Sequence, residues 1–412
     1  MEPVVITSAV RTPVGRYLGA LKTVEAYDLG ALVLDAAVAR IGLDPAQVDE
    51  VVMGQAYQSG EYVNIARMSL LTAGWPDTMP GITLDRRCCT GLDVIRYGAM
   101  LIQTGQAEIV AAGGVESMSN GEFYIPGSVK WGIGGEKGMP RGHGDLSIWG
   151  IVLYDRLQRG RVMSQPESRY GVLPSMMSWA ETAAEQENIT RKECDQWALG
   201  SHQKACAAME AGRFAAEMVP VTVPRRKGEP VVVDADENPR PDTSLEKLAR
   251  LTPVLGGVCT AGNSSSENDG AAAVVLMSGK KAAELGLDTY AAVKSVAVAG
   301  SDPRKTYKTV PAAAAKALAL AGTTLDEMDL IEIQEAFAAQ VLADLKEMGV
   351  PPDRYDRVNV NGSGISLGHP IAATGVRVLV SLAHEMKRRG AARALECVCG
   401  GGGLGIAAVL ER

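Results

Sequence analysis

The chain has 412 residues, of which 46% are hydrophobic and 22% charged, a composition typical of a globular protein with a large core. Its net charge of −7 argues against nucleic acid as a partner, and seven cysteines are too few for a disulfide scaffold of this length. No stretch reaches 18 uninterrupted apolar residues, and the N-terminal MEPVVITSAVRTP has no basic, apolar leader. We therefore expect a cytoplasmic protein with reduced thiols and no membrane insertion.

Two similar stretches lie about 280 residues apart. Residues 43–56, LDPAQVDEVVMGQA, and residues 325–336, LDEMDLIEIQEA, each combine an acidic helical lead-in, an aspartate, a short apolar strand and a turn. At the same offset, within one residue, Cys88 lies opposite His369. Each is followed by a helix with one apolar face, a glycine, a strand and a glycine group. The pattern indicates a duplicated chain.

Each half alternates apolar strands with helices, which predicts an α/β fold with a mostly parallel sheet covered by helices. We assign residues 1–119, completed by about 252–279, to an N-terminal core half, and residues 280–412 to a C-terminal core half. Residues 120–251 break the pattern with glycine-rich and tryptophan-containing stretches, and we predict an inserted loop subdomain there. Because equivalent ends of two duplicated halves can meet, we expect the Cys88 and His369 turns to form a composite active site.

The stretch LDRRCCTGLDVI, residues 84–95, places two adjacent cysteines just before a predicted helix. The positive end of the helix dipole and the unpaired N–H groups there favour a thiolate, which points to a reactive cysteine at 88 or 89. The commoner alternative for such a residue is a buried structural cysteine.

Two further stretches carry residues suited to the same chemistry. NVNGSGISLGHPIAATG sets His369, one of four histidines, in a glycine-dense turn that opens a helix, where it suits a general base for a thiol. Considered alone, a loop histidine without catalytic function is the more common case. CVCGGGGLG sets Cys399 before glycines whose N–H groups could line an oxyanion hole. A zinc site is disfavoured because C-x-C has no second ligand pair.

In this order and spacing, DRRCCTGLDVI, AAGGVESMS, TAGNSSSENDGAA, IEIQEAFA, NVNGSGISLGHPIAATG and CGGGGLGIA resemble the thiolase family, which includes acetyl-CoA acetyltransferases and 3-ketoacyl-CoA thiolases. The resemblance runs over essentially the whole chain, starting with AVRTPVGRY. It implies the thiolase fold, in which two duplicated α/β halves form a layered αβαβα arrangement with an inserted loop subdomain that binds CoA.

The resemblance also implies a role for each candidate residue. Cys88 would take the acyl group as a thioester, while Cys399 would handle the proton on the acetyl-CoA methyl carbon. His369 and a held water would form one oxyanion hole, and the N–H groups of Cys88 and Gly401 would form the other. Cys89 would be a packing neighbour.

The family's Asn-Glu-Ala-Phe loop, which holds that water, reads Gln334-Glu335-Ala336-Phe337 here. Glutamine keeps the amide but reaches one methylene further, so the loop or the water must shift. Trp179 stands where a small residue or threonine is usual, and SDPRKTYKTVPA lacks the usual Met-Gly-x-Gly-Pro, which leaves the acyl substrate open.

The resemblance implies CoA as a substrate and no permanently bound cofactor or metal. The residues expected to contact CoA or the thioester are Arg240, Ser265, Met176, Ala336 and Phe337. The basic run 225–227 could attract phosphate, although a solvated hairpin turn is the simpler interpretation.

We predict a thiolase that cleaves a 3-ketoacyl-CoA with CoA, or condenses two acyl-CoA units, through an acyl-Cys88 intermediate. Fatty-acid β-oxidation would be a typical setting, and a homodimer or homotetramer the typical assembly. Three alternatives stay open: a ketoacyl synthase, a thiolase-like acyl-CoA-binding or partner-dependent protein with an altered Gln334 loop, and a redox or metal protein built on the cysteine pairs.

Overall fold

The computed structural model describes residues 2–125 and 153–412. The glycine-rich stretch KWGIGGEKGMPRGHGD, residues 130–145, which contributed to the predicted inserted subdomain, lies outside the described residues. No helix in the described ranges has the length and apolarity that crossing a membrane requires.

The N-terminal half contributes six strands to the central sheet. Five follow the spatial order β4-β3-β5-β10-β1, and the short β2 pairs with β10. β3 is parallel to β4 and β5, whereas β10 is antiparallel to both β5 and β1. The bounds of these strands are β1 Val4–Arg11, β3 Glu50–Gly54, β4 Gly81–Leu84, β5 Ile109–Ser117 and β10 Asn268–Ser278.

The C-terminal half repeats this topology in the order β12-β13-β14-β11. β12 is parallel to β13 and bridges in parallel to Val358, which occupies the position that β4 has in the first half. β14 is antiparallel to both β13 and β11, and β1 pairs with β11 to join the halves. The bounds are β11 Ala291–Gly300, β12 Leu330–Ile333, β13 Arg393–Gly400 and β14 Leu404–Glu411. The matching topology confirms the duplication.

The sheet is mixed, and the expectation of a mostly parallel sheet was wrong. One reason lies in the sequence between β13 and β14, where three residues, 401–403, make the whole connection. A connection this short can only join antiparallel strands, because a parallel crossover needs a dozen or more residues. Gly402 and Gly403 have φ values of +86° and +78°, a conformation that glycine adopts without strain.

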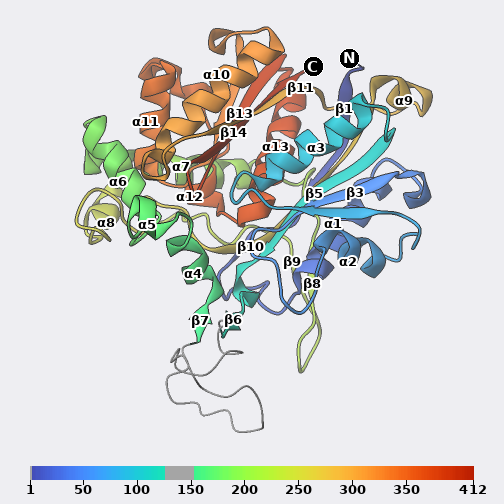
Figure 1. Ribbon diagram of the computed structural model, residues 1–412, viewed down its shortest axis with the longest axis horizontal. Helices are drawn as coiled ribbons and strands as arrows, with labels where there is room; N and C mark the ends of the chain where they lie inside the picture. Colours follow the sequence, from blue (N-terminus) through green and yellow to red (C-terminus); the bar gives the residue numbers. More distant parts are fainter. Residues whose placement is uncertain (1, 126–152) are drawn as a thin grey trace.

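Helices cover and separate the strands of the two halves, which gives the layered αβαβα arrangement (Figure 1). One buried cluster packs α1 and α2 on the N-terminal strands, a second surrounds α3 and α13 in the middle, and a third packs α10 and α11 on the C-terminal strands. The bounds are α1 Ala26–Ala39, α2 Ile65–Thr72, α3 Thr90–Gln103, α10 Thr309–Ala321, α11 Ala338–Met348 and α13 Ile371–Arg389.

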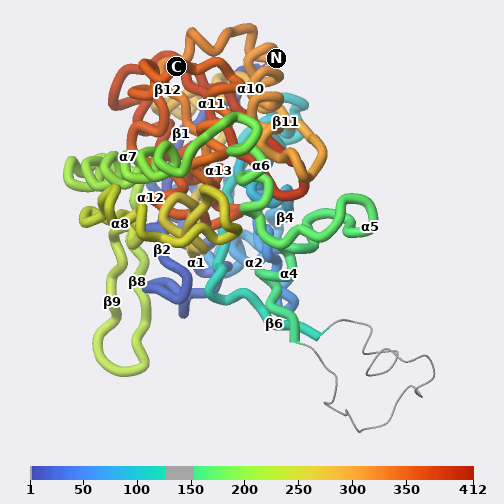
Figure 2. Tube along the Cα trace, turned by 90° about the vertical axis from the view of Figure 1, so that its left-hand side faces the viewer, coloured from blue at the N-terminus to red at the C-terminus, as the bar shows by residue number. Residues whose placement is uncertain are grey.

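The segment between β5 and β10 carries helices on one side of the core and a protruding hairpin (Figure 2). The hairpin β8–β9 holds residues 225–227 at its tip, where all three are exposed. The remaining main elements are β2 Gly15–Arg16, β6 Phe123–Tyr124, β7 Tyr154–Asp155, α4 Arg156–Val162, α5 Glu167–Tyr170, α6 Met177–Gln186, α7 Arg191–Glu210, β8 Val221–Val223, β9 Val231–Val233, α8 Leu245–Ala249, α9 Gly279–Glu284 and α12 Gly364–Leu367.

Candidate active site

A cavity of about 480 Å³ receives residues from both halves of the chain. Cys88 lines it from the turn between β4 and α3, His369 from the turn before α13, and Cys399 from the end of β13. The two turns that the duplication predicted to face each other therefore line one cavity. α3 and α13 lie side by side in the middle of the molecule, so their N-terminal ends carry Cys88 and His369 to the same place (Figure 1).

The turn before α3 places the side chains of the two adjacent cysteines in different surroundings. Arg87 has a φ of +55°, and the hydroxyl of Thr90 accepts a hydrogen bond from the Arg86 N–H at 2.7 Å. Cys89 is completely buried in the central core and its thiol donates to the Val398 carbonyl at 3.5 Å. Cys88 instead lines the cavity, so it is the thiol of the pair that a substrate can reach.

Burial raises the pKa of the Cys88 thiol above its ordinary value of 9.0. A hydrogen bond from the Gly401 N–H and the positive charge of Arg87 act in the opposite direction but do not cancel the effect of burial. At neutral pH the resting residue is therefore a protonated thiol, and attack on a carbonyl requires a group that takes its proton.

His369 has the tautomer needed to take a proton from the cavity side. The Thr374 hydroxyl donates to the Pro370 carbonyl at 3.0 Å, so its oxygen is the acceptor in the 2.7 Å contact with His369 Nδ1. This arrangement puts the ring proton on Nδ1 and leaves the lone pair on Nε2. Burial, together with the positive charges of Arg377 and Arg161, lowers the pKa of His369 to about 3, so the resting ring is neutral.

The backbone also fixes where the His369 ring lies. The His369 N–H donates to Asn268 Oδ1 at 2.8 Å, and the Asn268 side-chain amide donates to the Gly15 carbonyl at 2.8 Å. Gly368 has a φ of +96°, and a Cβ built on it would lie 2.6 Å from Asn268. Glycine is thus required there for the close approach that holds the histidine turn.

Cys399 is 2% exposed and lines the cavity with Gly401. Burial, and then the nearby Cys88, raise the pKa of Cys399 well above its ordinary value, so it is a thiol at rest and has a proton to give. A Cβ on Gly401 would lie 2.5 Å from the Met176 methyl group, so a larger residue here would require the Met176 side chain to move. The glycine run therefore combines a tight turn with an N–H group directed at the Cys88 sulfur.

Residues 334–337 form the loop after β12, and only some of them line the cavity. Ala336 and Phe337 line the cavity, whereas Gln334 is fully buried and is not among the lining residues. Gln334 Oε1 lies 3.4 Å from Arg377, and its Nε2 has no hydrogen-bond partner among the described residues. The amide thus lies behind the cavity wall, and the water-holding role inferred for Gln334 stays a prediction.

Glu335 of the same loop acts as an internal anchor. Its carboxylate accepts hydrogen bonds from Trp197 Nε1 at 2.9 Å and from the Ser201 hydroxyl at 2.6 Å, which ties the loop to α7. It also accepts from Asn359 and from the backbone N–H of Ile365. A buried carboxylate with this many donors fixes the wall next to Ala336 and Phe337.

The five residues expected at CoA or the thioester, Arg240, Ser265, Met176, Ala336 and Phe337, all line the same cavity. The Ser265 N–H donates to the Ala336 carbonyl at 2.9 Å, so two of the matched stretches are joined by their backbones. Trp179 packs edge-to-face on Phe337 with ring centroids 5.2 Å apart, and also lines the cavity. In contrast, residues 225–227 at the exposed hairpin tip do not contribute to it.

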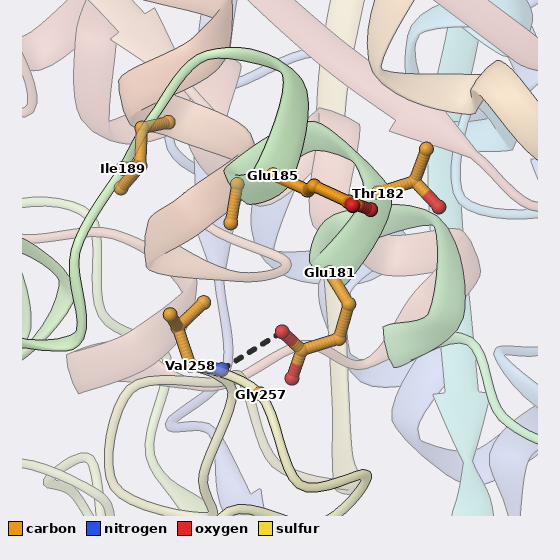
Figure 3. Close-up of a pocket in the computed structure, with 7 residues that line it drawn as sticks. Glu181, Thr182, Glu185, Ile189, Gly257 and Val258 are labelled. Carbon is orange, nitrogen blue, oxygen red and sulfur yellow. Dashed lines mark hydrogen bonds between the residues drawn. The ribbon is translucent and has the colours of Figure 1, made fainter.

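Hydrogen bonds to a glutamate of α6 hold the segment that leads to Ser265. Glu181 of α6 accepts hydrogen bonds from the N–H groups of Val258 at 2.8 Å and Cys259 at 2.9 Å, the first of which is drawn in Figure 3. A Cβ on Gly257 would overlap the Glu181 carboxylate, so a larger residue there would force this side chain to move. A small pocket beside Glu181 is lined by α6 and the neighbouring residues Ile189, Gly257 and Val258. It contains none of the candidate catalytic residues.

Comparison with known proteins agrees with this geometry. The family pattern described as "Thiolase, N-terminal domain" matches residues 4–280, and "Thiolase, C-terminal domain" matches residues 287–412. The chain belongs to the thiolase family. It is an acyltransferase of the thiolase type that uses CoA and acyl-CoA as substrates, and the non-catalytic alternative is not favoured.

Three relatives illustrate how far the similarity of this thiolase extends. The acetyl-CoA acetyltransferase of Pseudomonas aeruginosa is 44% identical over 100% of both chains. The β-ketoadipyl-CoA thiolase of Acinetobacter baylyi is 41% identical, again over 100% of both chains. The crystal structure of human mitochondrial 3-ketoacyl-CoA thiolase in complex with CoA has a TM-score of 0.89 and 35% identity, covering 100% of this chain and 98% of that one.

Sequence reasoning missed several polar residues of the thiolase cavity, among them Tyr57, Arg87, Arg161 and Glu267. Arg161 lies on α4, outside the stretches matched to the family, so its position could not be assigned from the sequence. Arg87 directly precedes Cys88, and Glu267 lies inside the matched stretch TAGNSSSENDGAA. Both are charged residues inside matched motifs, and this was the signal that could have found them.

Proposed function

We propose that this thiolase cleaves a 3-ketoacyl-CoA in two steps through an acyl-Cys88 thioester. The observation that carries the proposal is the meeting, at one cavity, of a protonated Cys88, a neutral His369 with its lone pair on Nε2, and a protonated Cys399. These are the nucleophile, the base and the acid that the two steps require.

In the first step His369 Nε2 takes the Cys88 proton while the sulfur forms a bond to the C3 carbonyl carbon. The C2–C3 bond then breaks, its electron pair stays on C2, and the Cys399 thiol gives its proton to C2, so that acetyl-CoA leaves. The N–H groups of Cys88 and Gly401 are suited to stabilise the negative oxygen that forms on C3, and Gly401 already donates to the Cys88 sulfur.

In the second step the thiol of a free CoA attacks the acyl-Cys88 carbonyl. The proton of that thiol passes to Cys399, and the imidazolium of His369 returns its proton to the departing Cys88 sulfur. The shortened acyl-CoA is released and the resting protonation states are restored. Run in reverse, the same steps condense two acyl-CoA units, because catalysis lowers the barrier in both directions.

We also propose a homo-oligomer and a cytoplasmic location for this thiolase. β4 stands at the end of the strand order, with one hydrogen-bonded neighbour among the described strands, and an open strand edge suits pairing with a second copy. All seven cysteines are free thiols, which fits a reducing compartment.

The proposal is tested by measuring CoA-dependent cleavage of 3-ketoacyl-CoAs of graded chain length, with and without branches, by wild type and two variants. Cys88→Ala is expected to abolish cleavage, whereas Cys89→Ala is expected to retain it with some loss of stability because Cys89 is a core residue. Cleavage that persists in Cys88→Ala would overturn the proposed nucleophile.

A further inference from the structure

The cavity has a polar region next to the reactive sulfur. Tyr57 and Arg87 lie close enough to Cys88 to couple electrostatically with its thiol, and Arg161 is coupled in turn to Tyr57. Glu267, which bridges to the backbone of His369, is the fourth member. We call these four residues the polar patch. The cavity lining also contains the polar Gln158 and the apolar residues Ala56, Met118, Val162 and Ile371.

Arg161 is the centre of the polar patch. Its Nη1 lies 2.5 Å from Glu267 Oε1, and the two side chains are only 23% and 27% exposed. It also hydrogen-bonds to the Tyr57 hydroxyl, which in turn donates to the Leu157 carbonyl at 3.3 Å. These contacts fix the guanidinium in the cavity wall and leave part of its five N–H donors free for a ligand.

Arg87 adds a second guanidinium to the polar patch. Its Nη1 donates to the Gly160 carbonyl at 2.8 Å, which ties the Cys88 turn to the helix that carries Arg161. Burial raises the pKa of Tyr57 to about 12, so its hydroxyl is neutral at physiological pH and also able to hydrogen-bond. The patch is therefore a set of fixed donors next to the acyl-transfer centre.

The charges of the polar patch do not balance. Among the lining residues, two guanidinium groups face one carboxylate, and His369, Cys88 and Cys399 are neutral at rest. The carboxylate of the buried Glu116 accepts hydrogen bonds from the N–H groups of Ala56 and Tyr57, but burial raises its pKa to about 7, so it adds only part of a second negative charge. A third arginine, Arg240, belongs to the part of the cavity expected to bind CoA. A partly buried cation without a counter-ion is costly, and a hydrocarbon tail placed here would remove its remaining water without replacing the lost hydrogen bonds.

We infer that the polar patch binds a carboxylate at the far end of the acyl chain, so that this thiolase acts on 3-ketoacyl-CoAs derived from dicarboxylic acids. The inference rests on the proposed function and specifies its substrate class. A carboxylate would supply the missing negative charge and accept charge-assisted hydrogen bonds from Arg161 and Arg87, while the apolar residues pack against the methylene groups of a short chain. The shortened acyl group carried on Cys88 would keep this carboxylate through both steps.

The first test compares substrates that differ only at the chain end. 3-Oxoadipyl-CoA and 3-oxohexanoyl-CoA have the same six-carbon chain, ending in a carboxylate and a methyl group respectively. We expect kcat/KM to favour the carboxylate by about 10-fold or more, since a site built to bind a charged group discriminates strongly against an analogue that lacks it. Equal values, or a preference for the methyl end, would overturn the inference. So would a preference for 6-hydroxy-3-oxohexanoyl-CoA over the carboxylate.

The second test removes the ion pair at the centre of the polar patch without leaving either partner unpaired. In the double variant Arg161→Met with Glu267→Leu, both partners of the ion pair are replaced by apolar residues of similar size, and the preference for 3-oxoadipyl-CoA is expected to fall to within about threefold of unity. Arg159→Met is the matched control, because Arg159 lies on the same helix, stacks on Tyr154 and does not line the cavity. It should keep the wild-type preference. An unchanged preference in the double variant would overturn the inference.

Cleavage of acetoacetyl-CoA separates this inference from the proposed function. The substrate is too short to reach beyond the reacting carbons, so its cleavage tests the acyl-Cys88 chemistry alone. Wild type that cleaves acetoacetyl-CoA and 3-oxohexanoyl-CoA but not 3-oxoadipyl-CoA would contradict only the carboxylate site. Wild type that cleaves none of the three would contradict the proposed function as well. This comparison of substrates uses wild type only, so its result does not depend on whether a variant folds.

Discussion

Gly91 of α3 and Gly375 of α13 meet backbone to backbone where the two central helices cross. A Cβ built on Gly91 would lie 2.6 Å from the Gly375 nitrogen, and one built on Gly375 would lie 2.5 Å from the Leu92 nitrogen. The contact lies three residues after Cys88 and six residues after His369. It therefore sets how closely the two catalytic turns approach each other.

Alanine at either glycine should push the helices apart, since the clash is with backbone and no side chain can move aside. We expect Gly91→Ala and Gly375→Ala each to destabilise the protein by about 3 kcal/mol or more, seen as a lower Tm, together with loss of thiolysis. Gly200→Ala in α7 is the control, because a Cβ built on Gly200 would meet no atom within 4 Å. This control should be neutral or stabilising by up to about 1 kcal/mol. A Tm unchanged by Gly91→Ala would contradict the close crossing.

Much of this arrangement was predictable from the sequence, because duplication leaves a pattern along the chain. The two matching stretches about 280 residues apart implied equivalent halves, and Cys88 and His369 at equivalent positions implied a shared site. The strand directions were not predictable in the same way. Period and apolarity do not distinguish parallel from antiparallel pairing, and a connection as short as the one between β13 and β14 fixes the direction of only one strand pair.

The limits of sequence reasoning are clearest at Gln334 and Arg161. Family likeness assigns Gln334 to the oxyanion water, a role that stays a prediction, but it gave no indication that the side chain would pack against Gly364 and Arg377 behind the cavity wall. Arg161 reaches the cavity from an inserted helix whose position depends on tertiary contacts, such as the hydrogen bond from Arg87 to Gly160. Hydrophobic periodicity reveals helices and strands, but it does not reveal where one longer side chain packs or which tertiary contact positions a helix.

Gln334 gives a direct test of whether the buried amide supports catalysis. We expect Gln334→Ala to lower kcat/KM by about 10- to 1,000-fold, the range for losing an oxyanion donor or its support. Gln334→Asn should be milder because it keeps the amide. A Tm measured in parallel separates the roles: a lower Tm with kcat/KM unchanged would mark Gln334 as purely structural.

Cys399 is expected to be indispensable only where a proton moves on or off C2. In the exchange of CoA with acyl-Cys88 it also carries a proton, but a thiolate is a good leaving group, so CoA can leave acetyl-CoA without that proton. Cys399→Ser should still form the acyl-Cys88 species from acetyl-CoA but should not support cleavage or condensation, because serine is a far weaker acid–base group than a thiol. Cys397→Ser, a buried neighbour on the same strand that does not line the cavity, is the matched control. Failure of Cys399→Ser to acylate would show that Cys399 also takes part in the first attack.

The raised pKa of Cys88 predicts a definite pH dependence for its reaction with iodoacetamide. The thiolate is the reactive form, so below the pKa the alkylation rate rises about tenfold per pH unit. Since burial raises this pKa above 9.0, the rate at the Cys88 peptide should still be rising at pH 9. Peptide mass spectrometry separates this signal from that of the half-buried Cys206. A plateau below about pH 8 would mean a resting thiolate instead.

The most direct test of the proposed mechanism is the position of the acyl group in the stalled enzyme. Wild type is incubated with a 3-ketoacyl-CoA in the absence of free CoA, quenched in acid, digested and analysed by mass spectrometry. The mechanism predicts the shortened acyl group as a thioester on Cys88, released when free CoA is added before the quench. An acyl group found on Cys89 or Cys399, or one that added CoA does not remove, would contradict it.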